Sequence, residues 1–149
     1  MEENYFKLLE YKQKLEETGD HLSLEEEKKL ANYQNQISDY FRWEKRTHFI
    51  EAMVDFLENK IDLDQYINRF HEIDFQVLAS KKKLTSDFES LRAFELDPCS
   101  KGFAILIENL FSDIRILEPD DELRSKDEIS ENSLRDGIKE FLPKIQNYS

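Results

Sequence analysis

The sequence predicts an all-α protein, an antiparallel helical bundle that carries an N-terminal helical hairpin. Three observations favour this fold class. The 149 residues include only 3 Gly and 3 Pro, so few positions interrupt a helix. Apolar residues recur every three or four positions along most of the chain, as on a helix face that packs against a core. No segment shows the alternation of apolar and polar residues that is typical of a half-buried strand.

The hairpin is expected within the first 45 residues. A helix over residues 2–17 stops at the glycine of TGDH, residues 18–21. Ser23 then begins the second helix, and Glu26 completes a capping box in which each side chain accepts from the other residue's backbone N–H. The helical pattern continues without Gly or Pro past Lys60. A break is expected between Trp43 and Thr47, although the pattern also allows one continuous helix from Leu24 to Lys60.

The next helix is expected to begin at Asp62, with Gln65 completing a second capping box. A charged link at Lys81–Lys83 then separates it from a short helix that starts near Thr85 or Ser86. The short helix ends at Asp97, because the residue before a proline avoids helical geometry. The buried face of the longer helix is predicted to contain six apolar residues: Tyr66, Ile67, Phe70, Ile73, Val77 and Leu78.

The most apolar segment, KGFAILIENLFSDI, begins near Ser100 and is expected to form the central helix. A last helix begins after its N-cap Ser130. Gly137 weakens it by roughly 1 kcal/mol relative to alanine, and Pro143 is expected to bend or end it. Six aromatic residues at helical spacing are assigned to the core: Phe70, Phe75, Phe88, Phe94, Phe103 and Phe111. The predicted division is an extension over residues 1–45 and a bundle over residues 46–149, with one continuous domain over residues 1–149 as the alternative.

The composition narrows the function classes. A net charge of −12 argues against direct binding to the phosphate backbone of a nucleic acid. The longest mostly apolar run, residues 103–111, is far shorter than the ~20 residues that span a bilayer. The N-terminus lacks the basic and apolar regions of a secretory signal, and the single Cys99 excludes an internal disulfide framework. We therefore expect a soluble, cytoplasmic protein.

No catalytic constellation is recognisable. His48 shares a helix face with Glu44 and Glu51, but no histidine has the glutamate three positions earlier that di-iron bundles use. Cys99 lies near a helix start without a recognisable base. No nucleotide-binding or hydrolase motif is present. The sequence thus predicts no enzyme, no metal and no cofactor, and a small metal or thiol enzyme built on these residues is the weaker alternative.

The strongest functional signal is the acidic stretch from Asp113 to Glu131. It contains eight acidic and three basic residues, so its net charge is −5. Pro119 stiffens a turn in which several carboxylates lie close together and repel one another. Such a turn is suited to accept charge-assisted hydrogen bonds from lysine and arginine of a partner. A solvated connector between two helices explains the same residues equally well.

Residues 49–145 resemble the colicin D immunity type of bacterial self-protection protein. One matching segment is FIEAMVDFLENKIDLDQYINRF, residues 49–70, in which a helix ends in a short turn and a second helix begins. The other is LFSDIRILEPDDELRSKDEISENSLRDGIKEFL, residues 110–142, in which an apolar helix leads through a P-D-x-E-L-R turn to a terminal helix. The N-terminal 45 residues lie outside this resemblance.

The resemblance implies a small antiparallel helical bundle that inhibits a toxic ribonuclease by covering its basic active site. The partner is then a basic protein, and acidic side chains take the place of substrate phosphates. Carried onto this sequence, the candidate contact residues are Asp113, Glu118, Asp120, Asp121 and Glu122. The alternative function is a helical adaptor or structural subunit of a protein complex that binds through the N-terminal hairpin. The oligomeric state is left open.

Overall fold

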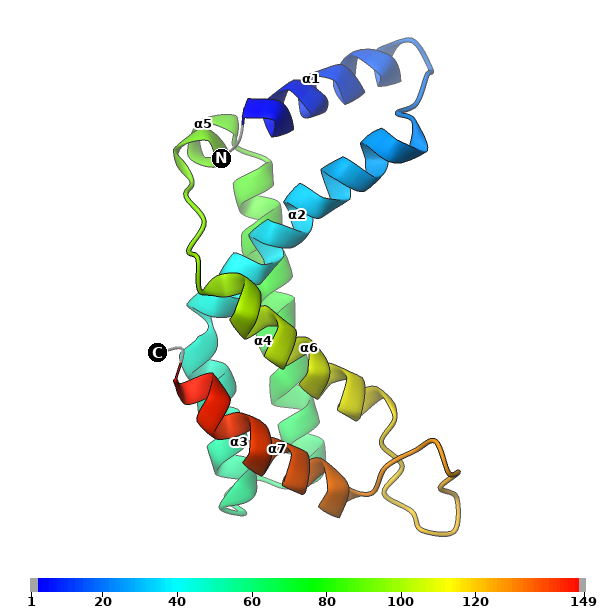
Figure 1. Ribbon diagram of the computed structural model, residues 1–149, viewed down its shortest axis with the longest axis vertical. Helices are drawn as coiled ribbons and strands as arrows, with labels where there is room; N and C mark the ends of the chain where they lie inside the picture. Colours follow the sequence, from blue (N-terminus) through cyan, green and yellow to red (C-terminus); the bar gives the residue numbers. More distant parts are fainter. Residues whose placement is uncertain (1–2, 148–149) are drawn as a thin grey trace.

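The predicted all-α class is confirmed. The computed structural model describes residues 3–147, which form seven α-helices and their connections (Figure 1). Over these residues no β-strand forms, and the only extended pairing is an isolated bridge. The helices are α1 (Glu3–Glu17), α2 (Leu24–Glu44), α3 (Arg46–Leu57), α4 (Leu63–Thr85), α5 (Phe88–Ala93), α6 (Ser100–Arg115) and α7 (Glu131–Gln146).

The N-terminal hairpin consists of α1 and α2, as expected. Gly19 has a φ of 78° after the end of α1, a left-handed conformation that a residue with a side chain seldom adopts. The capping box at the start of α2 is also confirmed. The Glu26 N–H donates to Ser23 Oγ at 3.2 Å, and the Ser23 N–H donates to Glu26 Oε1 at 3.1 Å. The chain therefore reverses direction within a few residues and returns towards the bundle.

The expected break after the hairpin occurs at Lys45. This residue leaves helical geometry and separates α2 from α3, while its N–H still donates to the carbonyls of Phe41 and Arg42. Residues 24–60 are thus not one continuous helix. At the end of α3, Asn59 adopts a φ of 60°, and the predicted capping box of Asp62 and Gln65 begins α4. The turn between Asn59 and Asp62 reverses the chain, so that α4 runs back along α3.

Three segments differ from the sequence prediction. The three lysines at residues 81–83 do not form a link but lie inside α4, which continues to Thr85; lysine is a good helix former, so a run of lysines does not end a helix. The short helix α5 begins at Phe88 and ends at Ala93, before Asp97. Pro143 does not end α7, which continues to Gln146.

Three residues assigned to the buried face or the core are exposed. Phe75 is 73% exposed, Leu78 54% and Phe88 44%. At 100° per residue, Phe75 lies on the side of α4 opposite the buried stripe, and Leu78 lies about a third of a turn from it. The stripe itself consists of Tyr66, Phe70, Ile73 and Val77.

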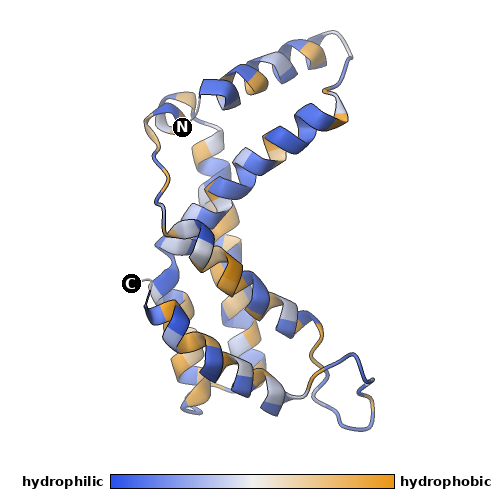
Figure 2. Cartoon of the chain, viewed as in Figure 1, coloured by the Kyte–Doolittle hydropathy of each residue, from blue (hydrophilic) through white to orange (hydrophobic). Residues whose placement is uncertain are grey.

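The buried side chains form two clusters. The large cluster lies between the end of α2 and helices α3, α4, α6 and α7, and it contains the rings of Phe49, Phe70, Phe103 and Phe111, which meet edge to face or at a tilt. The small cluster joins α1, α2 and α5, with Tyr5, Phe6, Leu30, Ile37 and Leu91 among its members, and Leu84 at the end of α4 packs against it. In Figure 2, which colours the chain by hydropathy, apolar residues recur among hydrophilic ones along the helices. Because α2 and α4 take part in both clusters, the division of the chain at residue 45 stays a prediction.

Arg42 joins three helices where the two clusters meet. Its Nε donates to Asp74 on α4 at 3.1 Å, and its Nη1 donates to Glu108 on α6 at 3.1 Å. Arg115 binds the other oxygen of Glu108 at 2.6 Å. These hydrogen bonds hold the pKa of Glu108 below its usual range. The guanidinium of Arg42 also lies over the Phe111 ring, 5.3 Å from its centre. Arg42 therefore packs against the large cluster in addition to forming its two ion pairs.

The helices together make a crescent (Figure 1). The α1–α2 hairpin forms one end, and the loop between α6 and α7 projects from the other. Within residues 3–147, no helix combines the length and the apolar character that a membrane span requires.

Candidate functional site

The acidic stretch forms a loop, residues 116–130, that connects α6 to α7 and projects from the end of the crescent (Figure 1). Its two ends are held together. The Glu118 N–H donates to the Ile129 carbonyl at 2.9 Å, and the Ile129 N–H donates to the Ile116 carbonyl at 2.8 Å. These bonds form the isolated parallel bridge of Leu117 with Ile129. The loop is therefore closed at its base.

Inside the loop, carboxylates stabilise the backbone turns. Glu118 Oε1 accepts from the Asp120 N–H at 3.0 Å, and Asp120 Oδ1 accepts from the Glu122 N–H at 2.9 Å. Glu128 Oε1 accepts from the Ser125 N–H at 3.0 Å. A carboxylate is a strong acceptor for backbone N–H groups, so these residues fix the shape of the loop as well as its charge.

Arg124 is the basic residue around which the loop folds, and the sequence analysis did not single it out. Its Nε donates to the Glu118 carbonyl at 2.9 Å, and its Nη2 lies 2.7 Å from Asp121 Oδ1. The Arg124 side chain is only 21% exposed, whereas Asp121 is 87% exposed. The guanidinium thus supports the loop from within and lowers the repulsion between carboxylates. The available signal was an arginine two residues after Glu122, the last carboxylate of the acidic turn.

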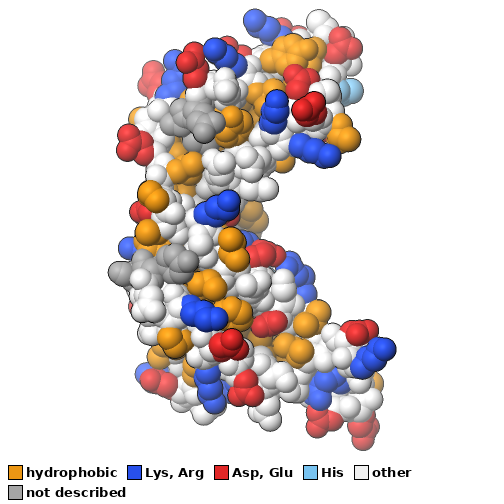
Figure 3. Space-filling model, viewed as in Figure 1, with side chains coloured by type: hydrophobic (Ala, Val, Ile, Leu, Met, Phe, Trp, Pro, Cys, Tyr) orange, Lys and Arg blue, Asp and Glu red, His pale blue; other side chains and the backbone are white. Residues whose placement is uncertain are grey.

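Four of the five predicted contact residues lie together in this loop. Asp120, Asp121 and Glu122 are exposed, and Glu118 is half-buried. Beside them Leu123, which sequence reasoning passed over, is 70% exposed. The space-filling view shows acidic side chains at the projecting tip, with basic side chains next to them (Figure 3). The loop therefore presents one large apolar side chain bordered by carboxylates.

Asp113, the fifth predicted contact residue, is not brought together with the other four. It lies on α6, half-buried, and its side chain faces α7, where a Cβ added at Gly137 would be 3.3 Å from Asp113 Oδ2. The glycine that weakens α7 thus makes room for this carboxylate. Burial raises the pKa of the Asp113 carboxyl above its usual range. The charge of Asp113 in turn contributes to the raised pKa of the buried Tyr66 hydroxyl, a shift caused mainly by burial.

The raised pKa of Asp113 predicts a pH-dependent effect of Asp113→Asn. An acid with a higher pKa in the folded than in the unfolded chain binds its proton more readily when folded. The protonated carboxyl therefore favours the folded chain, and this contribution to the free energy of unfolding is lost as the pH rises through the raised pKa. We expect Asp113→Asn to stabilise the protein at pH 7, and the gain to shrink as the pH falls towards the usual aspartate pKa of about 3.9.

Urea unfolding of both proteins at several pH values measures this difference. Asp136→Asn on α7 is the matched control, because Asp136 is exposed. A destabilised Asp113→Asn variant at pH 7, or a gain that grows on acidification, would contradict the assignment.

The other candidate residues are dispersed. His21, His48, His71 and Cys99 are all exposed, and they lie on different segments of the chain. Among the residues that the structure describes, no group of three histidine, cysteine, aspartate or glutamate side chains is arranged to hold a metal ion. The two arginines near Trp43 have intramolecular partners: Arg46 stacks on the Trp43 ring at 4.0 Å and donates to the Trp43 carbonyl, while Arg42 pairs as described above.

Comparison with models of known protein families, with characterised proteins and with solved structures gave no match. The resemblance to colicin D immunity proteins therefore stays a prediction from the motifs in residues 49–145.

Proposed function

We propose that this protein is a non-catalytic binding protein that places its acidic loop on a basic surface of a partner protein. The partner class that the resemblance implies is a ribonuclease toxin, and the protein then acts as an immunity-type inhibitor that covers the toxin's active site. The observation that carries the proposal is the loop itself. It projects from the end of the crescent, is closed at its base, and exposes Asp120, Asp121 and Glu122 around Leu123.

The chemistry of the loop fits a basic partner. A nuclease that grips RNA presents positive charge to the phosphates, and carboxylates offer that surface a competing set of negative charges. A net charge of −12 speeds the encounter between the two proteins. Leu123 supplies an apolar contact in the middle of the charged ones, the arrangement in which a buried anchor contributes most to an interface.

The internal hydrogen bonds of the loop also favour binding. A flexible loop loses conformational entropy when it is ordered in a complex, and this loss weakens the affinity. Here Glu118, Asp120 and Arg124 already hold the backbone in one shape. The loop can therefore bind with little further ordering.

The test is a neutralised loop, Glu118→Gln/Asp120→Asn/Asp121→Asn. Each amide keeps an oxygen acceptor in place of the carboxylate oxygen, so the bonds to the Asp120 and Glu122 N–H groups remain possible while three charges are removed. The matched control, Glu10→Gln/Glu17→Gln/Glu95→Gln, removes three charges from exposed positions at the other end of the crescent. Both variants change the net charge equally.

Wild type and both variants are used to capture proteins from the lysate of the source cell at low and moderate salt. We expect wild type and control to capture a basic ribonuclease and to inhibit its RNA cleavage. The neutralised loop should bind it about 10- to 100-fold more weakly, which corresponds to about 1.4–2.8 kcal/mol. Equal capture by the neutralised loop, or a captured partner with no nuclease activity, contradicts the proposal.

A further inference from the structure

Helix α4 carries large apolar side chains on the face opposite the core. Phe75 is 73% exposed, the highest fraction among the large apolar residues that the structure describes, and Leu78, one turn further along, is 54% exposed. Ile105 of α6 is also 54% exposed and borders the same hollow as Leu78. In Figure 1, α4 lies on the far side of the crescent, behind α2 and α6. These three side chains form the α4 patch, which no element within residues 3–147 covers.

Two charged side chains of α4 lie at the ends of this patch and lack partners. Glu72 lies before the apolar residues of α4 and Lys83 after them, and both are exposed. The arginine nearest to Glu72 along the helix, Arg69, pairs with Asp55 at 2.8 Å. Asp87, four residues after Lys83, accepts hydrogen bonds at the start of α5 instead. Within residues 3–147 the side chains of Glu72 and Lys83 therefore form neither an ion pair nor a hydrogen bond.

The two charges lie on one side of the α4 patch. At about 100° per residue, Glu72 is rotated about 60° around the helix axis from Phe75, and Lys83 about 80° in the same sense. Leu78 is rotated about 60° in the opposite sense. Along one edge, this face of α4 is therefore acidic before the patch and basic after it.

We propose that the α4 patch is the contact surface of a dimer, in which α4 packs antiparallel on α4 of a second copy. When Phe75 of one copy lies level with Leu78 of the other, Glu72 lies about 3 Å along the axis from Lys83 of the other copy. A two-fold axis between the helices keeps both charges on the same side, so this ion pair forms twice. At the same time Phe75 of each copy packs on Leu78 of the other, beside Ile105.

The charge pattern selects a second copy as the occupant. A two-fold interface brings residues of one face against residues of the same face, so its acidic and basic groups must lie at similar distances from its centre. Glu72 and Lys83 meet this requirement, because their distances from the midpoint between Phe75 and Leu78 differ by only two residues. An acidic helix would leave Glu72 unpaired, and a basic helix would leave Lys83 unpaired. A nucleic acid is disfavoured because Glu72 and the net charge of −12 repel its phosphates.

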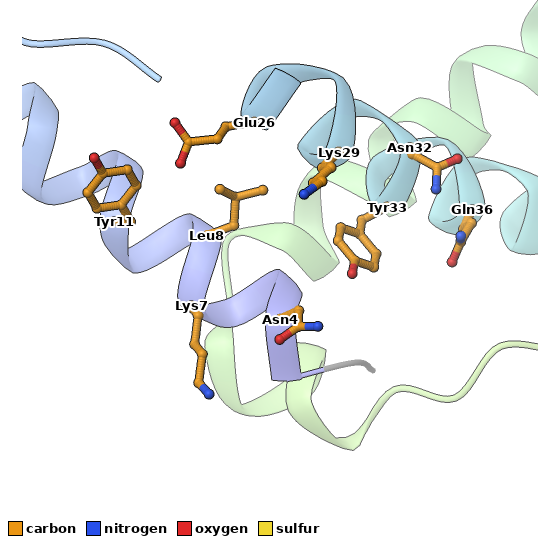
Figure 4. Close-up of a pocket in the computed structure, with 9 residues that line it drawn as sticks. All are labelled: Asn4, Lys7, Leu8, Tyr11, Glu26, Lys29, Asn32, Tyr33 and Gln36. Atoms are coloured by element: carbon orange, nitrogen blue, oxygen red, sulfur yellow. The ribbon is translucent and has the colours of Figure 1, made fainter. Parts of the chain in front are cut away.

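The hollow between α1 and α2 offers no comparable surface (Figure 4). Two of its charged side chains have intramolecular partners: Lys7 lies 3.5 Å from Glu3, and Glu26 accepts from the Ser23 N–H at 3.1 Å. Its most exposed apolar side chain is Tyr11, which is 46% exposed. This hollow therefore lacks the exposed apolar patch with a matched pair of free charges that α4 presents.

The dimer is expected to be weak. Three apolar side chains and two ion pairs bury less surface than the roughly 1,200–2,000 Å² of a standard interface. Each copy also carries a net charge of −12, and this repulsion opposes association until salt screens it. We expect a Kd of about 0.1 mM in moderate salt, so the chain is a monomer at the micromolar concentrations that unfolding experiments use.

Sedimentation equilibrium of the full chain, at concentrations up to about 1 mM, measures this association. The buffer is held at pH 8, where a histidine is uncharged, because His71 lies level with Lys82 of the other copy. The test variants are Glu72→Lys and Lys83→Glu, each alone and then mixed in equal amounts. Alone, each variant places like charges against each other at both edges of the dimer. Mixed, the two variants restore opposite charges at both edges.

The matched controls are Glu17→Lys on α1 and Lys139→Glu on α7. Both residues are exposed and lie outside the α4 patch, and the substitutions change the net charge as the test variants do. Phe75→Ala tests the apolar contact, and it should fold because Phe75 is exposed. No substitution touches the acidic loop, so the result is independent of the function proposed for that loop.

We expect each test variant alone to associate at least about tenfold more weakly than wild type, since two attractive pairs become repulsive. The controls should associate like wild type, and the mixture of test variants should recover the association. Phe75→Ala should also weaken it at least about tenfold, because apolar contacts are lost on both copies. A monomeric wild type at every concentration, undiminished association of Phe75→Ala, or a mixture that associates no better than its separate components overturns the proposal.

Discussion

Replacing Phe70 with alanine is expected to lower the free energy of unfolding by about 3–5 kcal/mol. Phe70 is fully buried in the large cluster, where its ring lies 4.9 Å from that of Phe49 and 5.0 Å from those of Tyr66 and Phe111. Truncation removes these contacts and leaves a cavity that the rings of Phe49, Tyr66 and Phe111 can fill only in part. Urea unfolding followed by circular dichroism measures the loss.

The control is Phe75→Ala, five residues further along the same helix. Phe75 is 73% exposed, so its truncation should change the free energy of unfolding by less than about 0.5 kcal/mol. If Phe70→Ala is too unstable to fold, Phe70→Leu retains most of the buried volume and allows the comparison. Similar losses for the alanine variants of Phe70 and Phe75 would show that α4 presents a different face to the core.

Replacing Arg42 with methionine is expected to cost about 2 kcal/mol. The Arg42 side chain is only 17% exposed and pairs with Asp74, which is 26% exposed, and with Glu108, which is 48% exposed. Methionine keeps much of the apolar stem but leaves Asp74 without its cation in a partly buried position. Arg42→Lys should recover only part of the loss, because one ammonium group cannot replace the planar fork that reaches both carboxylates.

Lys144→Met provides the comparison on the surface. Lys144 pairs with Glu140 at 3.8 Å, and both side chains are more than half exposed, so the expected change is below about 0.5 kcal/mol. Thermal unfolding at low and high salt separates the two cases, since salt screens an exposed pair more than a partly buried one. A loss at Arg42 no larger than that at Lys144 would show that the junction of α2, α4 and α6 is held by apolar contacts alone.

Local signals in the sequence predicted the helix ends well. Ser23 with Glu26, and Asp62 with Gln65, satisfy backbone groups within four residues of each other, so no distant contact is needed to recognise them. The loss of the apolar period between Trp43 and Thr47 indicated a bend or a break there, and the structure places the break at Lys45. Helix boundaries that depend on tertiary packing were harder to predict from the sequence. Pro143 is tolerated inside α7, although proline lacks the N–H that an interior position donates.

Burial was predicted less well, because it depends on which helix packs on which face. Phe75 and Phe88 were placed in the core by residue type, whereas the structure exposes both. Four of the five predicted contact residues do lie together in the acidic loop. Asp113 differs because it precedes the loop on α6, where helical geometry turns its side chain towards Gly137.

The closed base of the loop has a consequence for the sequence changes that its tip can accept. Because the bridge of Leu117 with Ile129 brings the ends together, residues between them are tied to the bundle only through these two positions and their neighbours. The cost of closing a loop rises slowly with its length, so residues can be inserted or exchanged at the tip with little effect on folding. Changes of length and charge at the tip can therefore accumulate while the helical scaffold stays the same.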